Sequence, residues 1–261
     1  MTTTYTNYQL ISRDIDRSIE RISQQPQVQR ETEYYLSRIG DIKSIDDFMA
    51  DDRIYNYAMK AFGLEDMSYA KAFMRKVLTE GIDNDNAFAN QLADGKYKAF
   101  AEAFNFNRYG ETATVFTRAQ QGAVDMYLRQ TLEEEAGSDD TGVRLALFFE
   151  RNASDITSAY SILADEALYQ VVRTVLGLSD AFAAGDIDKQ ADYLKEKLDF
   201  ADFSDPEKLD EFLQRFTIMW DLENNSAAGI GGSNLLLSSS SGFDISPDLM
   251  LTINNLKLGG R

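Results

Sequence analysis

Apolar residues recur at intervals of three and four along most of the chain, which is the period of an α-helix with one buried face. Prolines, which interrupt helices, occupy only three of the 261 positions. The pattern therefore predicts an all-α fold. Near the N-terminus it predicts one amphipathic helix, which Pro26 ends or separates from the next. The apolar stripe of this helix is Tyr8, Ile11, Ile15, Ile19 and Ile22.

One pattern of 17 residues occurs twice in the chain, 114 positions apart. The two stretches are Ala50–Asp66, ADDRIYNYAMKAFGLED, and Ala164–Asp180, ADEALYQVVRTVLGLSD, and six of their 17 aligned positions are identical. The alignment continues upstream without a gap, and downstream the order of the apolar segments is preserved. Such self-similarity predicts an internally duplicated helical module.

Both copies carry the signals for one complete helix. Asp51 and Asp165 suit the N-cap position, because a carboxylate there can accept hydrogen bonds from the N–H groups of the first turn. Gly63 and Gly177, each followed by leucine, suit a left-handed C-terminal cap. We therefore expect the same helix, with the same start and end, in both halves of the chain.

The chain is predicted to contain five segments. A longer connecting helix over Glu111–Glu135 joins two units of four to five helices each, and the AGSDDTG that follows predicts a solvated turn. After Leu222 the composition changes to Gly, Ser and Asn, which predicts a flexible tail that ends in a short C-terminal helix. The segments are 1–28 (N-terminal helix), 29–108 (unit one), 109–141 (connecting helix and turn), 142–222 (unit two) and 223–261 (linker and last helix).

Charge and composition exclude several classes of function. The chain has 26 Lys and Arg against 43 Asp and Glu, a formal charge of −17, which would repel phosphate backbones and anionic lipids. The absence of Cys and His excludes disulfides, thiolate or histidine metal sites and serine–histidine triads. No stretch approaches the ~20 apolar residues of a membrane span, and no secretory signal pattern is visible. We expect a non-enzymatic protein with no nucleic-acid partner and no membrane insertion.

Two acidic clusters could carry chemistry but have a simpler interpretation. Asp46, Asp47, Asp51 and Asp52 could hold a hard cation, yet they lie at the starts of two successive predicted helices, where the helix dipole already favours negative charge. The EEEAGSDD of Glu133–Asp140 is most simply a solvated helix end and turn. We therefore predict no metal, no cofactor and no catalytic residue.

Three stretches carry a pattern that extends over most of the chain. They are Arg30–Gly81, which holds the first copy of the repeated phrase, AFNFNRYG at Ala103–Gly110, and GVRLALFFERNASDITSAYSILAD at Gly142–Asp165. Together they resemble a bacterial family known as domain of unknown function 1217. The resemblance implies a helical protein, often with more than one copy of the unit, that is encoded among flagellar genes. It implies no activity and no set of catalytic residues.

Two functional hypotheses fit these observations. The first is a structural or accessory protein of the flagellum, made in the cytoplasm and exported by the flagellar type III route, with which the polar N-terminus is compatible. The second is a cytosolic adaptor or export chaperone whose acidic surface binds a basic or amphipathic segment of another flagellar protein. In the first, both terminal helices would bind other flagellar proteins or a second copy of the chain. The predicted partner-binding residues are Tyr8, Ile11, Ile15, Ile19, Ile22, Leu249, Ile253 and Leu256.

Overall fold

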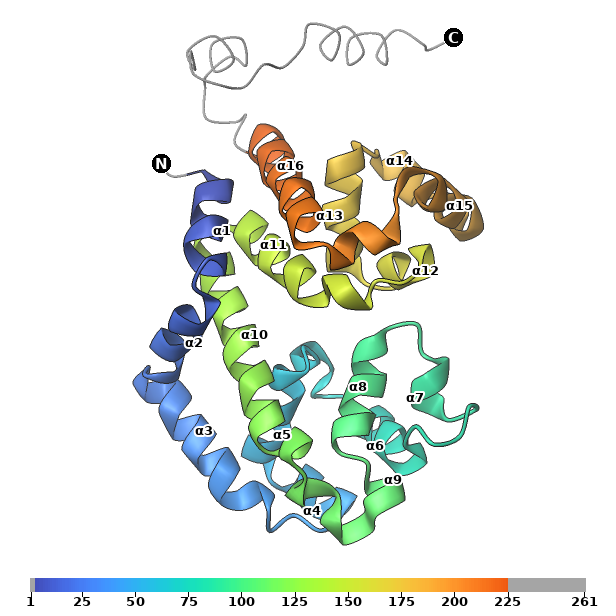
Figure 1. Ribbon diagram of the computed structural model, residues 1–261. Helices are drawn as coiled ribbons and strands as arrows, with labels where there is room; N and C mark the ends of the chain where they lie inside the picture. Colours follow the sequence, from blue (N-terminus) through green and yellow to red (C-terminus); the bar gives the residue numbers. More distant parts are fainter. Residues whose placement is uncertain (1–2, 225–261) are drawn as a thin grey trace, which may run out of the picture. The chain divides into compact units, whose positions relative to one another are not determined.

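The computed structural model describes residues 3–224, and these residues form helices, turns and short connections without any strand (Figure 1). The predicted all-α class is confirmed. The part of the chain that ends at Asp221 forms one compact unit.

The first half of the chain contains nine α-helices and one 3₁₀ turn among the described residues. They are α1 Thr4–Ser12, α2 Ile15–Ser23, α3 Pro26–Ile39, α4 Ile45–Ala50, α5 Asp52–Ala61, η1 Glu65–Met67, α6 Lys71–Glu80, α7 Phe88–Gln91, α8 Gly95–Ala103 and α9 Phe106–Tyr109. The described part of the second half continues the series. It consists of η2 Gly110–Val115, η3 Thr117–Ala119, α10 Gln121–Asp139, α11 Thr141–Asn152, η4 Ala153–Asp155, α12 Ala159–Leu163, α13 Glu166–Leu176, α14 Asp180–Ala183, α15 Ile187–Lys197, η5 Phe200–Ser204 and α16 Pro206–Asn224.

The units thus hold more helices than the four to five that we predicted. The additional ones include α7, α9 and α14, which have only four residues each. A segment this short completes about one turn, so it presents no repeating apolar face from which a helix could be predicted.

Two hydrophobic cores lie on either side of α10. The first core is built from α2 to α10, with Phe48, Phe100 and Phe104 fully buried at its centre. The second is built mainly from α11 to α16 and has Phe149 and Phe216 fully buried. Helix α10 packs against α5 of the first group and α11 of the second, and in Figure 1 it runs from one group of helices to the other. It therefore joins the two cores, as a connecting helix should.

The single N-terminal helix that we predicted is two helices, α1 and α2. The chain turns at Arg13–Asp14, and the Asp14 carboxylate accepts a hydrogen bond from the N–H of Arg17 as the N-cap of α2. The turn has a clear packing reason. It lets α1 contact the second core while α2 contacts the first, which one straight helix would not do.

The predicted connecting helix is displaced toward the C-terminus. Glu111–Glu135 was expected to be helical throughout, but α10 begins only at Gln121 and continues to Asp139, so the predicted turn AGSDDTG is largely helical. Tertiary hydrogen bonds explain the late start. The Thr114 hydroxyl donates to the Ile42 carbonyl at 2.8 Å, and the Tyr35 hydroxyl donates to the Ala119 carbonyl at 2.6 Å. These contacts hold the segment before α10 against α3 as 3₁₀ turns.

The helices of the repeated phrase have the predicted starts and ends. Asp51 and Asp165 are the N-caps of α5 and α13, which confirms both assignments. Gly63 and Gly177 adopt φ values of 65° and 62°, and the N–H of the leucine after each donates to a carbonyl five residues back, at 2.8 and 2.9 Å. Both helices therefore end in the same left-handed cap. Duplication of the whole module stays a prediction, because the helices that follow differ in number between the halves.

The start of α11 depends on a glycine. Asp140 caps this helix by accepting a hydrogen bond from the Gly142 N–H at 2.8 Å. A Cβ atom at Gly142 would lie 2.4 Å from Cδ1 of Trp220 and 2.8 Å from Cγ2 of Thr4. Since Trp220 belongs to α16 and Thr4 to α1, the missing side chain lets three helices meet.

Replacing Gly142 by alanine is expected to lower the free energy of unfolding by about 1–3 kcal/mol, because the new methyl group overpacks this meeting point. Alanine is otherwise favoured over glycine inside a helix by about 1 kcal/mol. Gly95→Ala in α8 is the matched control, since a Cβ there meets nothing within 4 Å. Urea denaturation measures both. A Gly142→Ala protein as stable as wild type would show that the close approach does not matter.

Candidate functional site

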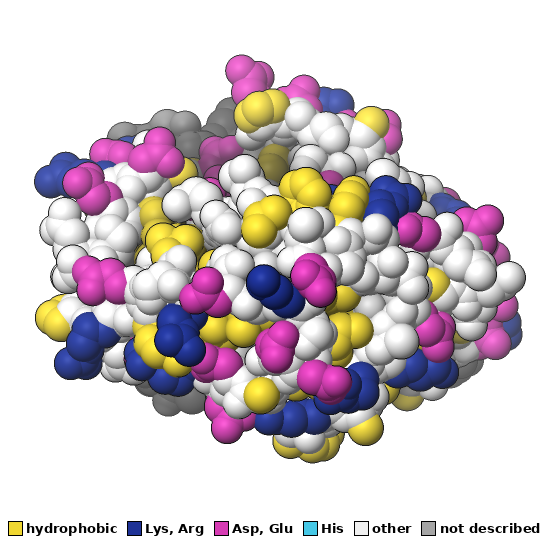
Figure 2. All heavy atoms as spheres, turned by 90° about the horizontal axis from the view of Figure 1, so that it is seen from below, with side chains coloured by type: hydrophobic (Ala, Val, Ile, Leu, Met, Phe, Trp, Pro, Cys, Tyr) yellow, Lys and Arg dark blue, Asp and Glu magenta, His cyan; other side chains and the backbone are white. Residues whose placement is uncertain are grey.

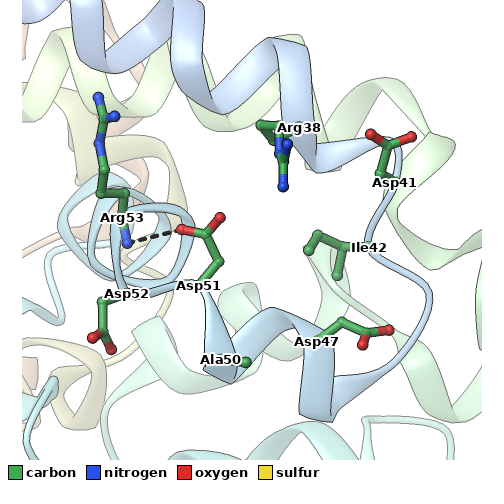
Figure 3. Close-up of a pocket in the computed structure, with 8 residues that line it drawn as sticks. All are labelled: Arg38, Asp41, Ile42, Asp47, Ala50, Asp51, Asp52 and Arg53. Carbon is green, nitrogen blue, oxygen red and sulfur yellow. Dashed lines mark hydrogen bonds between the residues drawn. The ribbon is translucent and has the colours of Figure 1, made fainter.

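A recess lies where α3, α4 and α5 meet. This recess has a volume of about 540 Å³. Its walls are Arg38, Asp41, Ile42, Asp47, Ala50, Asp51, Asp52 and Arg53. Figure 3 shows the Asp51 carboxylate and the Arg38 guanidinium directed toward its middle, whereas Asp52 is turned away. The recess therefore presents carboxylates from two successive helix starts beside basic side chains.

The four aspartates predicted as possible cation ligands do not converge on one point. Asp46 forms an ion pair with Arg75 at 2.5 Å and Asp52 one with Lys71 at 2.7 Å, both with α6. Asp47 accepts a hydrogen bond from the Ser44 hydroxyl at 2.7 Å at the start of α4. Over residues 3–224, no group of three acidic side chains is placed to hold a metal ion. Helix starts and ion pairs therefore account for these carboxylates.

Of the four aspartates, Asp51 accepts the most hydrogen bonds. Its Oδ1 accepts from the backbone N–H groups of Arg53 and Ile54, both at 3.1 Å, and its Oδ2 accepts from the Tyr34 hydroxyl at 2.7 Å. Partial burial by itself would raise the pKa of Asp51, but these hydrogen bonds outweigh it and lower the pKa below 3.8. The ionised carboxylate is thus favoured by the fold.

Replacing Asp51 by alanine is expected to lower the free energy of unfolding at pH 7 by about 1–2 kcal/mol, the usual effect of losing an N-cap. Because the folded-state pKa is depressed, the stabilisation is fully present above pH 3.8 and is lost as the pH falls through the folded value. The difference between wild type and variant should therefore shrink in acid. Urea denaturation at pH 7 and pH 3 measures it, with Asp52→Ala as the exposed control. Equal losses for both variants would contradict the cap assignment.

The corresponding aspartate of the second half has a different partner. Asp165 Oδ1 caps α13 through the N–H groups of Ala167 and Leu168, while Oδ2 pairs with Lys96 Nζ of α8 at 2.8 Å. The Asp165 side chain is only 11% exposed. Burial by itself would lower the pKa of Lys96, but the hydrogen bond and attraction from Asp165 raise it. This pair is a direct contact between the two halves of the chain.

A second charged cluster lies inside the body, between α10 and α11. Glu133 is 1% exposed and accepts hydrogen bonds from Arg129 at 3.0 Å and from Arg151 at 2.9 Å. Arg129 also donates to the Leu147 carbonyl at 3.0 Å and lies 3.7 Å from Glu150. The prediction of a solvated helix end over Glu133–Asp140 is therefore wrong for Glu133. The reason is that α11 folds back along α10 and covers it.

With this geometry described, the chain can be compared with known proteins. The family model "Protein of unknown function (DUF1217)" matches residues 61–209. The chain belongs to this family. The crystal structure of protein AGR_C_984 from Agrobacterium tumefaciens is 54% identical, with a TM-score of 0.80, over 86% of this chain and 97% of that one. No curated protein matches. The predicted membership in DUF1217 is thus confirmed, and the flagellar association stays a prediction.

In this DUF1217 protein the N-terminal stripe contacts the chain's own cores. Tyr8 is buried in the second core and Ile22 in the first, and Ile11 packs against both. Ile15 and Ile19 are partly buried against the first core. The N-terminal residues that we predicted to bind a partner are therefore packed within the chain in this conformation, because the turn between α1 and α2 directs the stripe to both cores. The other predicted partner-binding residues, Leu249, Ile253 and Leu256, lie outside the described residues.

Polar contacts hold the same two helices in place. The Thr4 N–H donates to Asp221 at 3.2 Å, the Gln9 amide donates to Asp210 at 2.8 Å, and Arg21 pairs with Glu135 at 2.6 Å. Residues of this N-terminal segment lie outside the range matched by the DUF1217 model. They belong to the body of this family member nonetheless, because they complete both of its cores.

The described structure has a second hollow, of about 450 Å³, beside Lys197, Lys208 and Arg215. Figure 2 shows the face that carries α4 and α9, with acidic and basic side chains mixed among patches of apolar ones. Within residues 3–224 no helix is both long and apolar enough to cross a membrane. The recess at Asp51, the contact at Asp165 and the hollow at Lys208 are the positions of this DUF1217 protein that we consider further.

Proposed function

We propose that the protein is a non-enzymatic structural or accessory protein of the bacterial flagellum, which acts by binding other proteins. The observation that carries the proposal is the state of the acidic residues around the recess. Asp46, Asp51 and Asp52 are engaged in helix caps or ion pairs, and over residues 3–224 no group of three acidic side chains is placed to hold a metal ion. Resemblance to DUF1217 supports the flagellar setting.

The proposal includes export by the flagellar type III route and a role in assembly. Because the N-terminal stripe is occupied by the chain's own cores, the predicted apolar face of Leu249, Ile253 and Leu256 is the better candidate for binding a partner. The tail is also close to neutral, since residues 225–261 hold two acidic and two basic side chains, whereas the body carries the whole net charge. A neutral apolar segment meets less repulsion from an acidic partner than the body would.

Deletion of residues 243–261 tests the assembly role in a motile bacterium that carries the gene. We expect reduced swimming and less protein in the filament fraction, while the shortened protein unfolds at the same temperature as wild type. Deleting residues 1–25 is the less useful variant, because it would uncover both cores. Unchanged swimming and unchanged assembly after the tail deletion would refute the role.

Cell fractionation separates this proposal from the second candidate, a cytosolic adaptor or export chaperone. The formal charge of −17 and the acidic recess favour that candidate, because both would attract a basic segment of a client protein. An exported component appears in the medium or in the filament fraction. A chaperone remains in the cytosol, and finding the protein only there would replace the first proposal by the second.

A further inference from the structure

The N-cap aspartates of the two halves share one local arrangement. In both, Oδ1 accepts hydrogen bonds from two first-turn N–H groups, at 3.1 Å in α5 and at 2.9 and 3.1 Å in α13. In both, a serine N-cap, Ser44 or Ser158, starts a short helix immediately before the aspartate. Since Oδ1 serves the helix, Oδ2 is the atom that can take a partner from elsewhere.

In the second half, that partner is a lysine from the first half. Lys96 Nζ, at the start of α8, lies 2.8 Å from Asp165 Oδ2 and 5.5 Å from the centroid of the Phe148 ring. The Lys96 side chain is 31% exposed, so the contact is shielded from solvent on most sides. The first half thus binds the second at its N-cap aspartate.

In the first half, the corresponding position is the open recess at Asp51. Four residues of the recess recur at the spacing of 114, as the pairs Asp41 and Asp155, Ile42 and Ile156, Ala50 and Ala164, and Asp51 and Asp165. The Tyr34 hydroxyl bonds Asp51 Oδ2 where the second half has Phe148, and a carboxylate oxygen can accept a further donor. Asp41 and Asp47 are exposed, and within residues 3–224 neither forms an ion pair. The recess therefore has acceptors for a cationic side chain.

The second half also has a counterpart to Lys96. Helices α8 and α16 both begin at a capping aspartate, and each cap is followed by two phenylalanines four residues apart. Phe100, Phe104 and Phe216 are fully buried, and Phe212 is partly buried. Lys96 corresponds to Lys208, Phe100 to Phe212 and Phe104 to Phe216, all at one spacing. The capping aspartates, Asp94 and Asp205, are one residue closer together in the sequence than these pairs. Lys208 thus occupies the place in α16 that Lys96 occupies in α8.

Lys208 is accessible to a partner. Its side chain is 56% exposed and pairs with Asp202 of η5, the turn before α16. Two more exposed basic residues, Lys197 and Arg215, line the same hollow of about 450 Å³ beside it. The same hollow is also lined by Asp199, Asp202 and Glu211, so this end of the protein presents three basic side chains interleaved with three carboxylates.

We propose that copies of this protein associate head to tail, with the Lys208 end of one copy docked in the Asp51 recess of the next. The contact repeats, between chains, the one that Lys96 and Asp165 make within the chain. Because the two surfaces differ, a pair of docked copies leaves one Lys208 end and one Asp51 recess free. Such heterologous contacts build open chains rather than closed dimers. The proposal goes beyond the flagellar role and does not depend on it.

Sedimentation velocity and light scattering of the purified full-length protein at about 0.15 M salt test this inference, because salt screens the repulsion between copies that each carry a formal charge of −17. We expect the average mass to rise with protein concentration. Lys208→Glu and Asp41→Lys each reverse a charge on one of the two surfaces. Each variant alone is expected to associate at least about tenfold more weakly than wild type, the effect of losing one close charge pair.

Mixing the two variants gives the decisive result. Lys208→Glu keeps the recess and Asp41→Lys keeps the lysine end, so an equimolar mixture should form a dimer and nothing larger. Lys189→Glu is the control. It makes the same charge change at an exposed position of α15 that belongs to neither surface, and it should assemble like wild type. Wild type that stays monomeric at every concentration would overturn the proposal, and so would variants that assemble as wild type does. Fractionation tests the flagellar role separately, because this experiment needs only purified protein.

Discussion

Replacing Glu133 by alanine is expected to lower the free energy of unfolding by about 3–5 kcal/mol, the usual range for removing one partner of a buried ion pair. The Glu133 carboxylate is 1% exposed and is shared by Arg129 and Arg151, whose side chains are 14% and 23% exposed. Burial lowers the pKa of Arg151, and the Glu133 carboxylate opposes that effect. Without Glu133, Arg151 would lose the carboxylate with which it pairs, and Arg129 would keep only Glu150, 3.7 Å away. Urea denaturation at pH 7 measures the loss.

Glu135→Ala is the matched control for this variant. Glu135 lies two residues away on the same helix and pairs with Arg21, but its side chain is 39% exposed and that of Arg21 is 58% exposed. An exposed pair of this kind contributes at most about 1 kcal/mol. Glu133→Gln should fall between the two, because it keeps the volume and one acceptor but removes the charge. If Glu133→Ala and Glu135→Ala cost the same, the buried cluster does not hold α10 and α11 together.

Replacing Phe48 by alanine is expected to cost about 3–5 kcal/mol of unfolding free energy, through lost burial and the cavity that remains. Phe48 is fully buried in α4, and its ring centroid lies 4.8 Å from that of Phe104 and 6.0 Å from that of Phe106. It also meets Tyr55 edge to face at 6.1 Å. One side chain of a six-residue helix thus packs against three other elements of the first core. Chemical denaturation followed by circular dichroism measures the effect.

Tyr69→Ala tests whether burial, rather than aromatic character, sets this cost. The Tyr69 side chain is 83% exposed, so its removal should change stability by no more than about 0.5 kcal/mol. The Phe48 variant should also shift the thermal midpoint down. A loss below 1 kcal/mol for Phe48→Ala would mean that the first core closes around the missing ring, and would contradict the packing described for α4.

The candidate site could be predicted in part. The N-cap role of Asp51 and Asp165 was predictable because a cap is a local arrangement, set by a side chain and the next three backbone N–H groups. The recess was not predictable, since its walls come from α3, α4 and α5 and depend on the angles between them. The ion-pair partner of Asp165 could not be predicted either, because Lys96 lies 69 positions away in the sequence.

The buried charges illustrate the same limit. Glu133 stands in a run of three glutamates, a pattern typical of a solvated helix face, and nothing in the run distinguishes it from Glu135. Only the return of α11 along α10 buries one and leaves the other exposed. A carboxylate in such a place is stabilised by Arg129 and Arg151 from two helices, and neither the burial nor the pairing is a property of local sequence.

The sequence by itself determined the helical class, the repeated helix with its aspartate start and glycine end, and the family to which the chain belongs. Each of these depends on residues within a few turns of one another, where spacing and cap chemistry act directly. Tertiary structure alone decided that the N-terminal stripe breaks into two helices, that the connecting helix starts late, and which carboxylates are buried. Those outcomes depend on contacts between residues far apart in the chain, such as Tyr35 with Ala119 and Tyr8 with the second core, which local periodicity does not encode.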